Sequence, residues 1–132
     1  MSSNPMTTKT KVTIMAWGFK HGAVPDSKYL FDLRSLRNPH RNPRFRSLTG
    51  LHPDVAKDVF DAPGALMLLS NAIRLVSDHI RHFEDDLTVI FACTGGRHRS
   101  VAFVYRMAEE LRAEFDANLE IRVKTPMLEG MT

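Results

Sequence analysis

The residues with the clearest chemical potential are eight consecutive ones, Cys93-Thr94-Gly95-Gly96-Arg97-His98-Arg99-Ser100. An apolar run, 87–92, comes directly before them, and a segment with helical period, 101–115, follows. A glycine-rich turn between a strand and a helix binds anions, because backbone N–H groups point into the turn and the helix N-terminus carries partial positive charge. This helix is also basic at its start and acidic toward its end, an order that costs stability unless an anion neutralises the basic end. The turn therefore predicts a phosphate or phosphoester site.

The same eight residues match C-x5-R-S, the phosphate loop of cysteine-dependent phosphatases. In that alternative Cys93 attacks phosphorus, Arg99 holds the phosphate oxygens, and Asp26 is the candidate general acid that such a reaction needs. A third interpretation is a purely structural turn at the end of a strand. The pattern is short, so we favour anion binding, assign no catalytic residue and leave open whether the protein is an enzyme.

A long loop, 34–50, carries a second cluster of groups that suit phosphate. Guanidinium groups bind phosphate oxygens in a bidentate manner, and interleaved prolines hold the chain extended. The loop has a single aromatic residue between its arginines, Phe45, so base stacking is not indicated. The arginines predict either an RNA-binding surface or an ordinary solvated basic loop, and the candidate RNA-binding residues are Arg37, Arg41, Arg44 and Arg46.

Asp32 and Arg34 flank Leu33, and strand alternation places them on one face, where they form either an ion pair or part of a ligand site. His21, His40 and His98 match no metal-binding spacing. We therefore expect no metal site and no cofactor.

The elements that must position these groups follow from hydrophobic periodicity. The helix at 64–83 has the clearest stripe, with Leu66, Leu69, Ile73, Val76, Ile80 and Phe83 on one face. We predict strands at 11–18, 29–33, 87–93 and 119–123, and helices at 52–60, 64–83 and 98–115. This order predicts a single α/β domain, a small sheet with flanking helices, whose ligand site lies at the carboxyl end of strand 87–93.

Composition sets the wider limits. The 132 residues carry a net charge of +3 and are 43% hydrophobic, which suits one domain with a real core. A single cysteine excludes an intramolecular disulfide, so we expect a cytoplasmic protein. The longest apolar runs are too short to span a bilayer, and we expect no membrane partner. Residues 1–10 are expected to form a disordered tail and 126–132 a loose one.

Five ordered segments resemble the C-terminal domain of the RapZ family of RNase adapter proteins. They are Gly18-Phe19-Lys20-His21-Gly22, Phe31-Asp32-Leu33-Arg34, Asn38-Pro39-His40, Leu48-Thr49-Gly50-Leu51 and Cys93 to Val101. We take 11–125 as the family-like domain. The resemblance implies a non-enzymatic regulatory domain that binds a small RNA, presents it to an RNase, senses glucosamine-6-phosphate and forms a homodimer.

The resemblance also implies a sugar-phosphate pocket. Its phosphate would lie on the turn 94–99, with the amine of the sugar facing Asp32. The implied ligand-binding residues are Asp32, Arg34, His40, Cys93, Thr94, Gly95, Gly96, His98 and Arg99.

Two departures from the family matter. RapZ proteins carry an N-terminal nucleotide-binding domain, but G-x-x-x-x-G-K-[ST] does not occur in this sequence, so nucleotide hydrolysis is not indicated. The family also has a strongly basic C-terminal tail. In this chain the corresponding residues, 119–132, carry little net charge, because Arg122 and Lys124 are balanced by Glu120 and Glu129.

Overall fold

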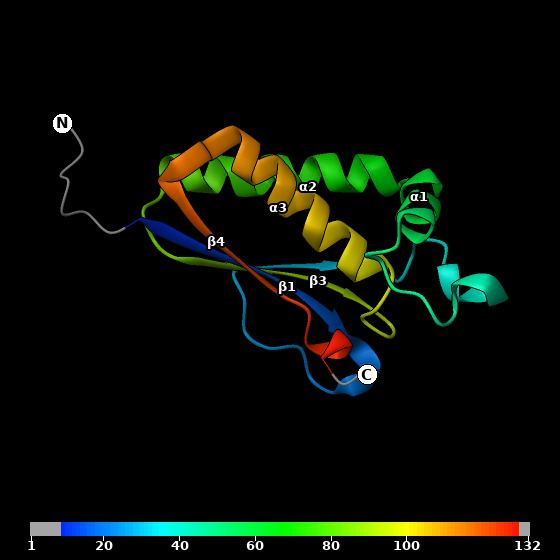
Figure 1. Cartoon of the computed structure of the whole chain (residues 1–132). Helices are drawn as coiled ribbons and strands as arrows, with labels where there is room; N and C mark the ends of the chain where they lie inside the picture. Colours follow the sequence, from blue (N-terminus) through cyan, green and yellow to red (C-terminus); the bar gives the residue numbers. More distant parts are fainter. Residues whose placement is uncertain (1–8, 130–132) are drawn as a thin grey trace.

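Four parallel strands bring their carboxyl ends to one edge of a single sheet (Figure 1). The computed structural model describes residues 9–129. The strands are β1 (Thr10–Gly18), β2 (Tyr29–Asp32), β3 (Leu87–Cys93) and β4 (Leu119–Lys124), in the spatial order β2-β3-β1-β4. Because β3 and β1 are central and Gly18 pairs with Cys93, the segments that follow these two strands start side by side. The predicted α/β architecture is confirmed.

Three helices lie on one face of this sheet: α1 (Pro53–Asp61), α2 (Ala65–His82) and α3 (Arg99–Phe115) (Figure 1). In β1, Val12, Ile14 and Ala16 are fully buried and alternate with half-buried residues, which is the pattern of a strand covered mainly on one side. Val101, Val104 and their neighbours along α3 complete the core, so α3 is anchored over the sheet along its length. This packing fixes the N-terminus of α3 beside the end of β3.

The predicted apolar stripe of α2 is correct at its centre and wrong at its ends. Leu69 and Val76 are buried, and Ile73 and Ile80 pack against the core. Leu66 and Phe83, however, are 56% and 57% exposed. The buried side is shifted toward Ala65, Ala72 and His79, and Phe83 has extended backbone just beyond the helix, so it leaves the helical face.

Regular structure extends beyond the predicted domain, 11–125, at both ends. Thr10, assigned to the disordered tail, is the first residue of β1, where it pairs with Leu119. Pro126–Leu128, assigned to the loose tail, form a 3-10 turn, and Leu128 packs against the core. Residues 1–8 and 130–132 of the predicted tails lie outside the described residues.

Within residues 9–129, no single helix is both long and apolar enough to cross a membrane. Only α1 and α2 taken together reach that length and composition, and they meet at a bend of 94°.

Candidate functional site

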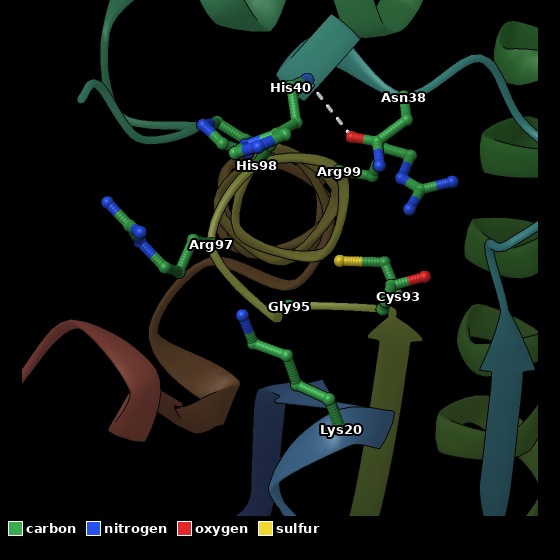
Figure 2. A pocket seen from close by; sticks show the side chains of 9 residues that line it. Lys20, Asn38, His40, Cys93, Gly95, Arg97, His98 and Arg99 are labelled. Carbon is green, nitrogen blue, oxygen red and sulfur yellow. Dashed lines mark hydrogen bonds between the residues drawn. The ribbon is translucent and has the colours of Figure 1, made fainter. Parts of the chain in front are cut away.

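A pocket of about 140 Å³ lies at the carboxyl end of β3, against the N-terminus of α3 (Figure 2). Three segments line it: the turn after β3, the short helical turn after β1, and the loop after β2. This is the place where open parallel sheets bind ligands. The lining residues are Lys20, Asn38, His40, Cys93, Thr94, Gly95, Arg97, His98 and Arg99.

The turn after β3 wraps around the sulfur of Cys93. The Gly96 N–H donates to Cys93 Sγ at 3.3 Å, and a second hydrogen bond of 3.3 Å joins Sγ to Ser100 Oγ. Gly96 adopts φ = +75°, a left-handed conformation that favours glycine, and this tightens the turn. The turn then enters α3 through His98, so the first free N–H groups of a 17-residue helix face the pocket end of β3.

Lys20 reaches the turn from the short helical turn that follows β1, the strand next to β3. Its backbone N–H donates to Thr94 O at 3.1 Å, because β1 and β3 run in parallel and end together. In Figure 2 the Lys20 side chain extends toward Gly95. A cation from the turn after β1 is thereby added to the basic start of α3.

Arg99 combines a structural role with a free edge. It is 3% exposed, and its Nη1 donates to the carbonyl oxygens of Leu33 (3.3 Å), Arg34 (3.3 Å) and Leu36 (2.8 Å). Its Nε is buried without a hydrogen-bond partner among the described residues. One nitrogen of the guanidinium therefore holds the loop after β2, while Nε keeps an unused donor.

The far wall comes from the loop after β2. Asn38 Oδ1 accepts from the His40 N–H at 3.1 Å and so caps a short helical turn that carries His40. The ring of His40 lies 6.2 Å from the ring of His98, measured between centroids. His98 Nε2 in turn donates to the Phe45 carbonyl at 2.9 Å, which ties this loop to the start of α3.

Burial lowers the pKa of His98 below its usual range, although hydrogen bonds to the Phe45 and Leu48 carbonyls partly oppose this. The charges of Arg97 and His40 lower the pKa further. His98 is therefore neutral near pH 7. A neutral imidazole with Nε2–H as donor matches its contact with Phe45.

This pKa shift predicts how stability depends on pH. Because the unfolded chain takes up a proton at a higher pH than folded His98 does, stability is full above about pH 6.5 and falls as the pH drops below it. We expect the melting temperature of the wild type to fall between about pH 6.5 and 5.5 more steeply than that of His98→Gln, which keeps a donor for Phe45. Equal slopes for the two proteins would contradict the assignment.

The charge balance of the pocket points to an anion. Lys20, Arg97 and Arg99 all line it, and no carboxylate is present among its lining residues in the described part of the chain. Arg97 also has a buried Nε without a hydrogen-bond partner within residues 9–129. Three cations, a helix N-terminus and two unpartnered guanidinium N–H groups together fit an oxyanion such as phosphate.

Six of the nine predicted ligand-binding residues line this pocket, and three do not. Gly96 lies beneath it, packed against the backbone of Gly18. Asp32 and Arg34 form an exposed ion pair with a 2.7 Å contact, and the Arg34 guanidinium also lies 3.9 Å above the Phe19 ring. The hydrogen bond from Arg34 holds the pKa of Asp32 below its usual range. Of the two interpretations of Asp32 and Arg34, the structure shows the ion pair.

Three residues that line the pocket were missing from the predicted site: Lys20, Asn38 and Arg97. Arg97 and Lys20 each carried a signal in the sequence. Arg97 belongs to the basic start of the helix, and Lys20 lies two residues after the end of the predicted strand 11–18. The parallel pairing of β1 with β3 makes Lys20 a neighbour of the turn, and this pairing is not evident from periodicity.

The predicted RNA-binding arginines are largely engaged with the protein itself. Arg37 Nη2 contacts Asp58 Oδ1 at 3.1 Å, and Arg41 lies 3.9 Å from the same carboxylate. Arg44 pairs with Asp54, and Arg46 Nε donates to the His40 carbonyl at 2.9 Å. RNA binding through this loop stays a prediction, and the two carboxylates of α1 do not favour it because they neutralise much of its charge.

The phosphatase alternative loses its candidate general acid. Asp26 lies with Lys28 and Thr88 at the start of β3, where the Lys28 N–H donates to Thr88 O at 2.9 Å. A strand rises about 3.3 Å per residue, so the five positions from Thr88 to Cys93 place Asp26 about 16 Å from the sulfur. Asp26 cannot protonate a leaving group at Cys93.

Within residues 9–129, no cluster of three or more histidine, cysteine, aspartate or glutamate side chains is arranged to hold a metal ion.

The sequence is similar to those of known proteins. A family model described as the RapZ C-terminal domain matches residues 10–125. A nucleotide-binding protein of Synechococcus sp. (strain JA-3-3Ab) is 42% identical over 75% of this chain and 31% of its own length. A nucleotide-binding protein of Macrococcus caseolyticus (strain JCSC5402) is 35% identical over 90% of this chain and 41% of its own length. The chain thus matches less than half the length of each of these relatives.

Proposed function

Since this chain belongs to the family of RapZ C-terminal domains, we propose that its pocket binds a phosphorylated small molecule as a regulatory ligand. The observation that carries the proposal is the set of three cationic side chains, Lys20, Arg97 and Arg99, around a pocket lined by no carboxylate of the described chain. The volume of about 140 Å³ suits a small metabolite, because pockets for drug-sized ligands measure about 300 to 1,000 Å³.

The ligand class that fits best is a sugar phosphate. The phosphate lies on the turn 94–99, where Arg97, Arg99 and the helix N-terminus supply donors. The side chains of Asn38 and His40, on the opposite wall, bind the hydroxyl groups of the sugar. Glucosamine-6-phosphate is the member of this class that the family resemblance suggests. Recognition of its amine by Asp32 requires the ion pair with Arg34 to open.

A thermal-shift titration tests the proposal. Glucosamine-6-phosphate, glucose-6-phosphate and inorganic phosphate are compared on the wild type and on Arg97→Gln. A ligand at 100 times its Kd stabilises the native state by about 2.7 kcal/mol, or roughly 10 °C for a domain of this size. We expect a sugar phosphate to give such a shift, larger than that of inorganic phosphate.

Arg97→Gln separates ligand binding from folding, because the Arg97 side chain, unlike that of Arg99, donates to no carbonyl group among the described residues. We expect its melting temperature without ligand to stay close to that of the wild type, while the ligand-induced shift is lost. Absence of a shift with all three ligands at millimolar concentration would contradict the proposal. A larger shift with glucosamine-6-phosphate than with glucose-6-phosphate would support recognition of the amine.

The wider activities of the relatives are separate proposals. The relatives are named nucleotide-binding proteins, and this chain matches 31% and 41% of the length of the two described above. Three kinds of association remain predictions from the family resemblance: with RNA, with an RNase and with a second copy of the chain. The pocket proposal depends on none of them.

A further inference from the structure

Cys93 is the chain's only cysteine, and its sulfur lies at the floor of the pocket. The side chain is 2% exposed, yet it lines the cavity, so access to Sγ is through the pocket and is limited to small molecules. In Figure 2 the Cys93 side chain extends from the tip of β3 beneath the start of α3. Cys93 is thus buried from the bulk surface and borders the pocket.

The groups around the sulfur are those that stabilise a sulfur anion. The Gly96 N–H donates to Sγ, and the Cys93 thiol donates to Ser100 Oγ, a hydroxyl that can turn to donate to the sulfur once the thiol has lost its proton. The first residue of α3 lies six residues later in the chain. The thiolate is the form of cysteine that peroxides oxidise.

A second, independent observation marks the same cavity as an anion site. Arg99 is 97% buried, and its Nε has no hydrogen-bond partner within the described residues, although both Arg99 and Cys93 line the pocket. In Figure 2 the Arg99 guanidinium lies between Asn38 and Cys93. Because Arg99 and Cys93 line the same small pocket, an anion bound to this guanidinium shares the cavity with Cys93.

We propose that Cys93 is a peroxide-sensitive thiol whose oxidation and the binding of the anionic ligand exclude each other. The thiolate attacks one oxygen of hydrogen peroxide, an S–O bond forms and the O–O bond breaks. The sulfur is oxidised by two electrons to a sulfenic acid, and the peroxide is reduced to hydroxide and the new sulfur-bound oxygen. A first low-molecular-weight thiol then attacks the sulfenic acid, which releases water and leaves a mixed disulfide, and a second such thiol attacks the mixed disulfide, which releases the Cys93 thiol and a low-molecular-weight disulfide. The exclusion part of this inference rests on the proposed function, whereas the reactivity of Cys93 does not.

The experiment counts one thiol. The native protein is exposed to hydrogen peroxide, the reaction is stopped with catalase, and the protein is unfolded in guanidinium chloride so that Ellman's reagent measures the remaining thiol. Because Cys93 is the only cysteine, the whole thiol signal belongs to it. Oxidation of methionines does not affect the count, because the reagent reacts only with thiols. Protein unfolded before peroxide is added gives the reference rate at the same pH.

We expect Cys93 in the native protein to react faster than in the unfolded reference, and Ser100→Ala to react more slowly than the wild type. Inorganic phosphate, compared with sodium chloride at equal ionic strength, should slow the reaction over the concentration range in which it raises the melting temperature. A native rate at or below the reference rate would overturn the proposal. A fast rate that phosphate does not change would overturn the mutual exclusion, whatever the thermal-shift result.

Discussion

Replacing Arg99 by alanine will lower the free energy of unfolding by about 3 to 5 kcal/mol, before any ligand is considered. The reason is that the Arg99 Nη1 group donates to three carbonyl oxygens, those of Leu33, Arg34 and Leu36, in a buried setting. Alanine leaves these acceptors without that donor and opens a cavity beneath the loop after β2. Since small domains are stable by about 5 to 15 kcal/mol, the loss is a large share of the total.

Urea unfolding of the wild type, Arg99→Ala, Arg99→Lys and Arg97→Ala measures this effect. We expect Arg99→Lys to lie between the wild type and Arg99→Ala, because an ammonium keeps the charge and several donors without the planar fork. Arg97→Ala should change stability by less than about 1 kcal/mol, since the loop is held by the Arg97 backbone carbonyl, which accepts from the Gly50 N–H at 2.8 Å and is kept in the variant. Equal stability of Arg99→Ala and Arg97→Ala would show that the carbonyl contacts contribute little.

This double role of Arg99 affects how any binding defect is read. A variant that loosens the 33–36 segment also displaces Asn38 and His40, which follow it on the pocket wall. Loss of ligand binding in Arg99→Ala would then not separate contact with the ligand from collapse of the wall. Arg97, whose side chain lines the same pocket, provides the cleaner test of ligand contact.

The sequence predicted the elements well because each has a strong local pattern. The alternation in β1 and the apolar run of β3 both appear where they were expected. The turn between β3 and α3 was predicted from glycine content and charge order, which are also local features. The predicted burial of Leu66 and Phe83, at the two ends of the α2 stripe, was wrong because exposure there depends on neighbouring elements. Ala65 and Ala72 allow close packing on one side, whereas Leu66 faces outward.

The remainder of the site depends on contacts that are distant in the sequence. Lys20 and Thr94 meet through the parallel pairing of β1 with β3, which no periodicity specifies. The Asp58 carboxylate reaches back by 21 residues to Arg37, so the charge of the basic loop could not be estimated from its own composition. Likewise, the sequence marks Arg99 as a phosphate ligand but does not show which of its nitrogens the fold has already used.

Gly96→Ala is expected to destabilise the fold by about 3 kcal/mol or more, through two separate costs. The φ of +75° is a left-handed conformation that costs an ordinary residue about 1 to 2 kcal/mol. A Cβ at this position would also lie 2.6 Å from the Gly18 backbone N and 2.8 Å from the Trp17 carbonyl carbon. Backbone atoms of a central strand cannot move aside cheaply, so β1 and the turn would have to separate.

Gly95→Ala is the matched control, because the two glycines are adjacent and only one is confined. A Cβ at Gly95 would have one neighbour, the Lys20 Cε atom, at an ordinary contact distance of 3.9 Å. We therefore expect Gly95→Ala to melt within a few degrees of the wild type, while its new methyl group occupies space at the pocket and weakens phosphate binding. Thermal melts with and without phosphate distinguish the two roles, one glycine required by the fold and the other by the ligand. A stable Gly96→Ala that still gives the phosphate-induced shift would mean that the turn tolerates a side chain, and the tight packing of β1 against β3 would then not be what shapes the site.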